Sequence, residues 1–255
     1  MMKLPRIVSA VSLCCALLVS GAVFSQDAGD SLKSDAGLFY RMHLPAQGSG
    51  GAPVVFLLHG MGSNELALMS LDSAFPDKYA VVSVRAPYEL QPGSYEWFQS
   101  KVVDGTMDGD EGQLDLSAQT IDELVTDLVR RYGFDRTRVY LVGFSQGAMM
   151  TYEVGLTHPR TYRGIGVMSG DLYGSLVPKV HPSMPLSKMK VFISHGDADQ
   201  RIPMQMAEQS YETLMRLGVR RTEFHVYPGM GHEINGAALD DLAHWLKFDT
   251  PDAGN

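Results

Sequence analysis

The stretch that decides the fold is VYLVGFSQGAMM, residues 139–150. It opens with an apolar run typical of a buried β-strand and continues as a helix-compatible segment. Between the two lies GFSQG (143–147), a G-x-S-x-G motif in the strand–turn–helix context that exposes a nucleophilic serine. Gly143 and Gly147 remove Cβ atoms that would clash in so tight a turn. We therefore expect Ser145 to present its hydroxyl at the carboxyl edge of a sheet, in front of the amino end of a helix.

Apolar runs of strand length and stretches of helical periodicity alternate along the rest of the chain. The runs lack polar alternation, as expected of strands buried on both faces of a parallel sheet. With no internal repeat and no second core, this pattern predicts a single-domain α/β fold, with a mostly parallel central sheet, helices on both faces and no large cap domain. The predicted strands are 38–44, at an edge, and then 53–58, 79–84, 139–142, 165–168, 191–194 and 222–227. The predicted helices include 66–75, 121–132, the segment after the serine, 203–217 and 239–246.

The first 25 residues differ in character from the remainder of the chain. Two basic residues within the first six precede a mostly apolar stretch, 7–19, and small residues follow up to Ser25. This pattern is typical of a secretory signal peptide, with cleavage after Ala22 or Ser25, and the apolar stretch is short for a bilayer span. Both cysteines lie inside the segment, so the mature chain is expected to have no thiol and no disulfide.

These features divide the chain into four predicted parts. Residues 1–25 are the signal peptide, 26–37 a flexible leader, 38–248 the α/β domain and 249–255 a C-terminal tail. We expect export to the periplasm or the medium, with no stable membrane span after cleavage. The formal net charge of −8 makes nucleic acid an unsuitable partner. The sequence assigns no oligomeric state.

A serine hydroxyl needs a base within hydrogen-bond reach, and the base in turn needs an orienting acid. Proteins with this G-x-S-x-G turn supply them in the chain order serine, acid, histidine. His232 follows the last predicted strand in a glycine-rich loop, PGMGHE, where a base at the sheet edge would lie. Asp199 follows the run 191–194 and precedes a helix start, which suits the acid, while Asp197 and Asp171 remain alternatives.

The oxyanion of an acyl-transfer intermediate needs two N–H donors. One is expected from the backbone of Gln146, directly after the nucleophile. The second is expected from the backbone of Met61, in the HGMG loop that follows an early buried strand. His59 and Gly60 of the same loop are candidate substrate-pocket residues, because small residues there let backbone approach substrate.

A long connection, 88–113, carries the aromatic segment YEWF (95–98). Connections of this length are usually functional or mobile. Tyr95, Trp97 and Phe98 are therefore candidate substrate-pocket residues. The other interpretation is that they only pack the loop down, and both stay open because buried aromatic residues most often serve packing.

Residues 104–115 partly fit a calcium-binding loop. Thr106 stands at the third position and Asp115 at the twelfth, where a bidentate glutamate is usual. A solvated acidic loop is the favoured interpretation. The segment HGDAD (195–199) has no second pair of histidines that would complete a metal site. We predict no metal and no cofactor.

Taken together, the motifs resemble the phospholipase/carboxylesterase family of α/β-hydrolases, which includes acyl-protein thioesterases, lysophospholipases and bacterial carboxylesterases. They follow the family's order and cover roughly residues 38–247. The matching segments are LHGMG (58–62), RAP (85–87), YEWF (95–98), GFSQG (143–147), HGDAD (195–199) with IP (202–203), and GH (231–232).

The resemblance implies a triad of Ser145, Asp199 and His232, with Met61 and Gln146 as oxyanion donors. It implies a serine-dependent hydrolase that cleaves short- to medium-chain carboxylic esters, and thioesters as a further option, through an acyl-serine. The partner is then a small-molecule ester. The export signal departs from the best-known thioesterases of the family, which are cytosolic. The alternatives are a lysophospholipase or polyester depolymerase on the same fold, and a non-catalytic secreted binding protein.

Overall fold

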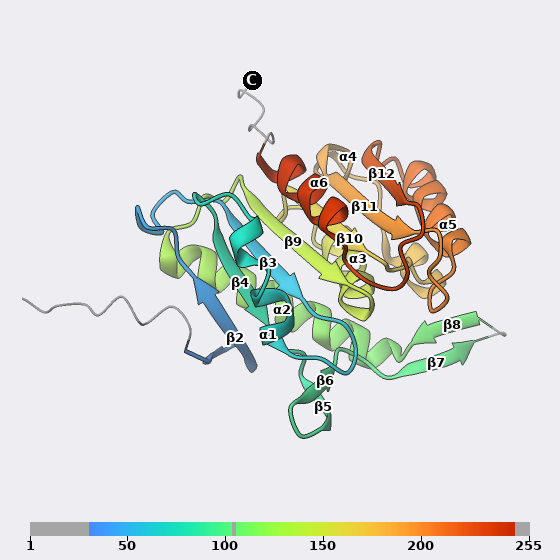
Figure 1. Cartoon of the computed structure of the whole chain (residues 1–255), viewed down its shortest axis with the longest axis horizontal. Helices are drawn as coiled ribbons and strands as arrows, with labels where there is room; N and C mark the ends of the chain where they lie inside the picture. Colours follow the sequence, from blue (N-terminus) through green and yellow to red (C-terminus); the bar gives the residue numbers. More distant parts are fainter. Residues whose placement is uncertain (1–30, 104–105, 248–255) are drawn as a thin grey trace, which may run out of the picture.

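The computed structural model describes residues 31–103 and 106–247, and the predicted signal peptide, the start of the leader and the C-terminal tail lie outside this range. An eight-stranded sheet forms the centre (Figure 1). Its strands, in spatial order, are β1 (Lys33–Asp35), β2 (Leu38–His43), β4 (Ala80–Val84), β3 (Val54–Leu58), β9 (Val139–Phe144), β10 (Gly164–Met168), β11 (Lys190–Gly196) and β12 (Arg221–Tyr227). The six strands from β4 to β12 in this order pair in parallel, and β2 runs antiparallel to both of its neighbours, β1 and β4, so the predicted mostly parallel sheet is confirmed.

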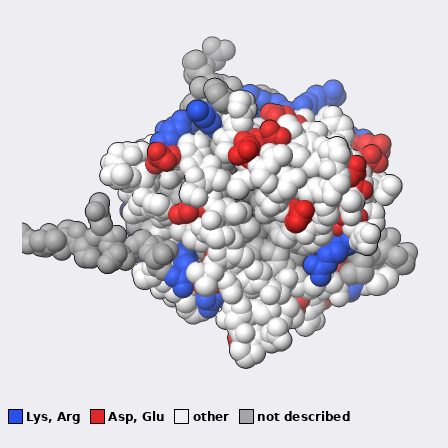
Figure 2. Space-filling view, in the orientation of Figure 1, with Lys and Arg blue, Asp and Glu red and all other residues white. Residues whose placement is uncertain are grey.

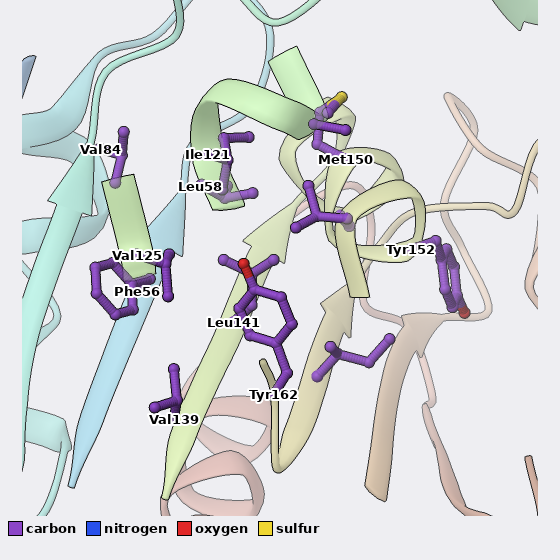
Figure 3. Packing of buried hydrophobic residues seen from close by; sticks show 14 of the residues in the cluster. Phe56, Leu58, Val84, Ile121, Val125, Val139, Leu141, Met150, Tyr152 and Tyr162 are labelled. Carbon is purple, nitrogen blue, oxygen red and sulfur yellow. The ribbon is translucent and has the colours of Figure 1, made fainter. Parts of the chain in front are cut away.

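The central strands are buried because both faces of the sheet are covered. Every residue of β3, β4 and β10 is buried, which explains their continuous apolar sequences. Alternate residues of β3 and β9 enter two different hydrophobic clusters, one on each face. Figure 3 shows the larger cluster, in which Phe56 and Leu141 of the sheet pack with Ile121 of a covering helix.

Helices of both faces supply the other half of these clusters. The larger cluster receives residues of α2, α3, α4 and α5, and the smaller one residues of α1 and α6. No separate cap domain is present among the described residues, in agreement with the prediction. The helices are α1 (Glu65–Met69), α2 (Glu111–Tyr132), α3 (Gln146–Thr157), α4 (Met184–Lys188), α5 (Met204–Arg216) and α6 (Gly236–Lys247), with 3-10 turns η2 (Asp72–Ala74) and η3 (Gly174–Lys179).

Two predictions about irregular segments need correction. The leader 26–37 contains a strand, because Lys33–Asp35 pairs with β2, so β2 is not the edge of the sheet. The connection 88–113 forms two hairpins and then the first turn of α2, and a glycine with a φ of +80° at position 93 allows the tight turn of the first hairpin. The hairpins are β5 (Tyr88–Gln91) with β6 (Ser94–Glu96), and β7 (Ser100–Val103) with β8 (Thr106–Gly109).

The surface is mixed in charge. On the face seen in Figure 2, acidic and basic side chains are interspersed along the upper rim, whereas the centre is largely uncharged. Within residues 31–103 and 106–247, no helix has the length and apolar character needed to cross a membrane. Asp104 of the acidic loop lies outside the described residues, and no group of potential metal ligands occurs within them.

Candidate active site

Ser145 sits at the strained turn between β9 and α3. Its φ of 55° and ψ of −122° fall where residues with a side chain are rarely found. A Cβ at Gly143 would lie 2.1 Å from the carbonyl oxygen of Gly147, and a Cβ at Gly147 would lie 2.1 Å from that of Leu58. The turn is anchored by Ser145 N–H, which donates to the Met168 carbonyl at 2.9 Å. Both glycines are therefore sterically required for this conformation.

His232 bridges the serine and a carboxylate. It lies in the loop after β12, and its Nε2 is 2.9 Å from Ser145 Oγ. Its Nδ1 is 2.8 Å from Asp199 Oδ2, in the loop after β11. Because an ionised carboxylate can only accept, Nδ1 carries the proton, and Nε2 is left to accept from the serine hydroxyl.

Asp199 is almost fully buried, at 6% exposure, yet well supplied with donors. Its Oδ1 accepts from the backbone N–H of Arg201 at 2.8 Å and of Ile202 at 3.0 Å. Burial raises the pKa of this carboxyl, but the hydrogen bonds from Ile202, His232 and Arg201 outweigh it and hold the pKa below its usual value. Asp199 is thus kept ionised beside the histidine.

The two other candidate acids have different surroundings. Asp197 Oδ1 accepts from the backbone N–H of Gly229 at 2.6 Å, and so fastens the turn that leads to His232. Asp171, after β10, borders the cavity in front of Ser145 and makes no contact with the histidine. Of the three aspartates weighed from the sequence, Asp199 is the one that reaches His232.

Both residues expected to donate a backbone N–H to the oxyanion lie near the serine. Gln146 is the first residue of α3, so its N–H has no partner within the helix. The loop carrying Met61 passes close to the nucleophile, since a Cβ at Gly60 would lie 3.2 Å from Ser145 Cβ. Met61 borders the open space on both sides of the serine.

The Gln146 side chain ties this turn to the aromatic segment. Its Oε1 accepts from Trp97 N–H at 2.8 Å, and its Nε2 donates to the Phe98 carbonyl at 2.8 Å. Trp97 Nε1 in turn donates to the His59 carbonyl at 2.8 Å. The aromatic segment therefore links the turn that carries Ser145 to the loop that carries His59.

The expectation that aromatic residues of this segment line a substrate pocket is wrong for Trp97 and Phe98. Both are fully buried, and neither borders the open space at the serine. Tyr95 is half-buried and lies 4.8 Å from the guanidinium of Arg85, also away from that space. The three rings serve packing, because Trp97 and Phe98 belong to the larger hydrophobic cluster and Tyr95 packs against it.

His59 borders the open space, but its ring is occupied. Nδ1 lies 2.8 Å from the Gly60 carbonyl, and Nε2 accepts from Ala86 N–H at 3.0 Å. Burial lowers the pKa of His59 to about 4, so the ring is neutral at pH 7. The role of His59 is to hold the loop between β3 and α1, and Gly60 leaves room for the serine.

Two cavities meet at the serine and share Met61, Ser145, Arg201 and His232. The first, of about 500 Å³, is bordered further by Met149, Asp171, Tyr173 and Met206. The second, of about 390 Å³, extends over α1 toward Leu71 and Ile234. Sequence reasoning missed Arg201 and Tyr173 as cavity residues. Their positions just after the carboxyl ends of β11 and β10 were the available signal.

The fold and the arrangement around Ser145 define an α/β-hydrolase. The sequence matches the phospholipase/carboxylesterase family over residues 46–249, and the chain belongs to this family.

Individual relatives agree with this assignment. The chain is 30% identical to a probable carboxylesterase of Oryza sativa subsp. japonica, over 76% of each chain. It is 27% identical to acyl-protein thioesterase 1 of Mycosarcoma maydis, over 80% of this chain and 93% of the relative. Among solved structures, esterase PE8 superposes with a TM-score of 0.69 at 29% identity, covering 82% of this chain and 98% of that one.

Proposed function

We propose that this protein hydrolyses carboxylic esters through an acyl-serine intermediate. The observation that carries the proposal is the unbroken chain of contacts from Asp199 through His232 to Ser145, at 2.8 and 2.9 Å. It opens onto a cavity within a member of the phospholipase/carboxylesterase family. Nucleophile, base and acid at these distances are the arrangement that activates a serine hydroxyl.

In the proposed reaction, Ser145 Oγ attacks the ester carbonyl carbon while His232 Nε2 takes the hydroxyl proton. The resulting oxyanion accepts hydrogen bonds from the N–H groups of Gln146 and Met61, each worth about 3–4 kcal/mol in such sites. The C–O bond to the alcohol then breaks, and His232 returns the proton to the departing oxygen. In the second half, water loses a proton to His232 and attacks the acyl carbon. The bond to Ser145 Oγ then breaks, His232 returns the proton to Oγ, and the acid is released. Asp199 stays ionised and stabilises the imidazolium.

The proposed substrates are esters of short- to medium-chain acids, with thioesters as a second group. A cavity of about 500 Å³ falls within the range of small-molecule sites. A relative that is named as a thioesterase supports the thioester option. A lysophospholipase or polyester depolymerase would differ in its preferred chain length, and a non-catalytic binding protein would hydrolyse nothing.

The decisive experiment treats the mature protein with a fluorophosphonate probe and assays nitrophenyl esters from acetate to palmitate. Ser145→Ala removes the nucleophile, and Ser187→Ala, on α4, is the matched control. We expect wild type and the control to label at one site and to turn over, and Ser145→Ala to do neither. A wild-type protein that neither labels nor hydrolyses would overturn the proposal in favour of a binding protein.

We also propose that the protein is exported by its first 25 residues. The support is the order of basic, apolar and small residues in that segment. Expression of the full chain in a bacterium, followed by fractionation and mass spectrometry of the N-terminus, tests it. Export predicts a periplasmic or extracellular product that begins at Val23 or Gln26, whereas a cytosolic product that keeps Met1 contradicts it.

A further inference from the structure

Asp171 is held against the nucleophile by its own loop. The loop follows β10, the strand next to β9, and reaches the sheet edge beside the serine turn. A Cβ at Gly170 would lie 2.5 Å from Ala148 Cβ and 3.2 Å from the Ser145 carbonyl oxygen. No space is left between the loop and the turn, so Asp171 borders the same cavity as Ser145 at a fixed position.

The Asp171 carboxylate is buried, and the one donor it has within the described residues is its own backbone N–H. Asp171 is 4% exposed, and in the described part of the chain no other residue donates a hydrogen bond to its carboxyl or forms an ion pair with it. Arg201 borders the same cavity but is exposed and does not reach it. Burial and the nearby Asp108 raise the pKa of Asp171 to about 6. Asp108 itself is satisfied, since it accepts from Ser175 Oγ at 2.7 Å.

A buried carboxylate is costly unless hydrogen-bond donors compensate for its lost hydration. Among the described residues, Asp171 receives a hydrogen bond from its own backbone N–H alone, and much of the remaining wall of this cavity is apolar, formed by Met149, Pro203 and Met206. An aliphatic chain in the cavity would leave the carboxylate unpaired. A molecule with a donor at the right place would satisfy it.

We propose that Asp171 accepts a hydrogen bond from a hydroxyl or protonated amine on the part of the ester that enters this cavity. Asp171 thus makes the protein prefer esters with such a donor over purely aliphatic esters of the same shape. The proposal deepens the proposed function and rests on it. Sites built to bond a polar group discriminate strongly against analogues that lack it, because the unpaired group in the site is penalised.

The test compares esters that differ in one group. In the acid part, nitrophenyl 3-hydroxybutanoate and 3-aminobutanoate are compared with the isosteric 3-methylbutanoate. In the alcohol part, 3-hydroxybutyl acetate is compared with 3-methylbutyl acetate. We expect kcat/KM to favour the donor-bearing ester by about 10- to 100-fold in at least one series, as for hydrogen bonds to a charged group. The series that shows the preference identifies the part of the ester that enters the cavity.

Two substitutions separate charge from hydrogen bonding. Asp171→Asn keeps an acceptor oxygen but not the charge, so it should lose the preference for the amine and retain part of that for the hydroxyl. Asp171→Leu should lose both and favour the aliphatic ester. Asp240→Asn removes an exposed carboxylate of α6 and should retain the wild-type ratios.

The outcomes distinguish the role of Asp171 from the proposed ester hydrolysis on which it rests. A labelled, active wild type with no donor preference in either series overturns the role of Asp171 alone, as does a preference that survives in Asp171→Leu. Absence of labelling and of hydrolysis for every ester overturns the proposed function, and the preference with it.

Discussion

Asp199 and Asp171 follow adjacent parallel strands, β11 and β10, and the first contacts His232 while the second borders the cavity at Ser145. The pKa of the Asp199 carboxyl is lowered, whereas that of the Asp171 carboxyl is raised. Solvent exposure is nearly the same for the two residues, 6% and 4%, and burial raises the pKa of both carboxyls. Asp199 accepts from two backbone N–H groups and His232, whereas Asp171 has only its own backbone N–H. The hydrogen-bond donors at Asp199 outweigh the effect of burial on its pKa, whereas the single donor at Asp171 does not.

The comparison also suggests a division of labour. A carboxylate that the protein stabilises in the absence of substrate suits a permanent role beside a base. One left without partners suits a role that begins when a ligand arrives. Environments that separate the pKa values of neighbouring acids are a common way to give them different tasks.

The largest expected effect comes from replacing Asp199, the carboxylate that the protein stabilises. Asp199→Asn should lower kcat by about 10⁴-fold, because an amide lets the imidazole adopt the tautomer that cannot accept the serine proton. Steady-state kinetics on a nitrophenyl ester measures it, with Asp240→Asn, at an exposed carboxylate of α6, as the control. Equal losses in the two variants would mean that Asp199 is not the acid.

The next effect concerns the contribution of Asp171 to the free energy of unfolding. The folded-state pKa of Asp171 is about 6 against a reference of 3.8, so the folded state holds its proton more tightly and loses stability as pH rises from about 4 to about 6. Asp171→Asn removes that loss and should be more stable than wild type by about 3 kcal/mol at pH 8, at about 1.4 kcal/mol for each pKa unit. Urea unfolding at pH 8 and pH 4 measures it. An equal difference at both pH values would contradict the burial effect.

A third and smaller effect has the opposite sign. The pKa of Asp199 is lowered in the folded protein, so its contribution to stability is present above the unfolded value of 3.8 and is lost as pH falls below it. Asp199→Asn should therefore destabilise the fold at pH 7, by about 1–2 kcal/mol for a lost charged hydrogen bond. The gap to wild type should narrow on acidification. If Asp199→Asn stabilised the protein as Asp171→Asn does, the contrast between the two sites would be lost.

The smallest expected effect is that of the Asp108 charge on the pKa of Asp171. Asp108→Asn removes a negative charge near Asp171 and should lower the pKa of that carboxyl by less than one unit, because burial is the larger cause. Carboxyl carbon NMR titration of Asp171 measures the shift directly. A rise in the pKa after this substitution would contradict the assigned cause.

Local sequence was enough to predict seven of the eight strands of the sheet and the strand–turn–helix around Ser145. The reason is that continuous apolar runs and paired glycines express constraints within a few residues. It left three aspartates open as the acid, because the choice depends on which one reaches His232 across the sheet edge. Local sequence also could not decide whether Trp97 and Phe98 pack in the core or line the substrate pocket, since both environments favour aromatic rings.

The cavity role of Asp171 was out of reach for a related reason. In sequence it is one more aspartate after a Ser-Gly pair, and its position against the serine turn depends on the close contact of Gly170 with Ala148. The structured leader was missed because a strand of three polar residues, Lys33–Asp35, has no apolar pattern and is stabilised by pairing with β2.

The two cavities that meet at Ser145 also bear on what can happen after the first half of the reaction. In the proposed reaction, an ester whose acid and alcohol parts occupy different cavities would leave one cavity vacant when the alcohol departs, and the next nucleophile could approach the acyl carbon from that side. Water is one such nucleophile, and a second alcohol that fits the vacated space is another. If the proposed reaction holds, an alcohol that fits the vacated space would compete with water, and part of the acyl group would then be transferred to that alcohol instead of being hydrolysed.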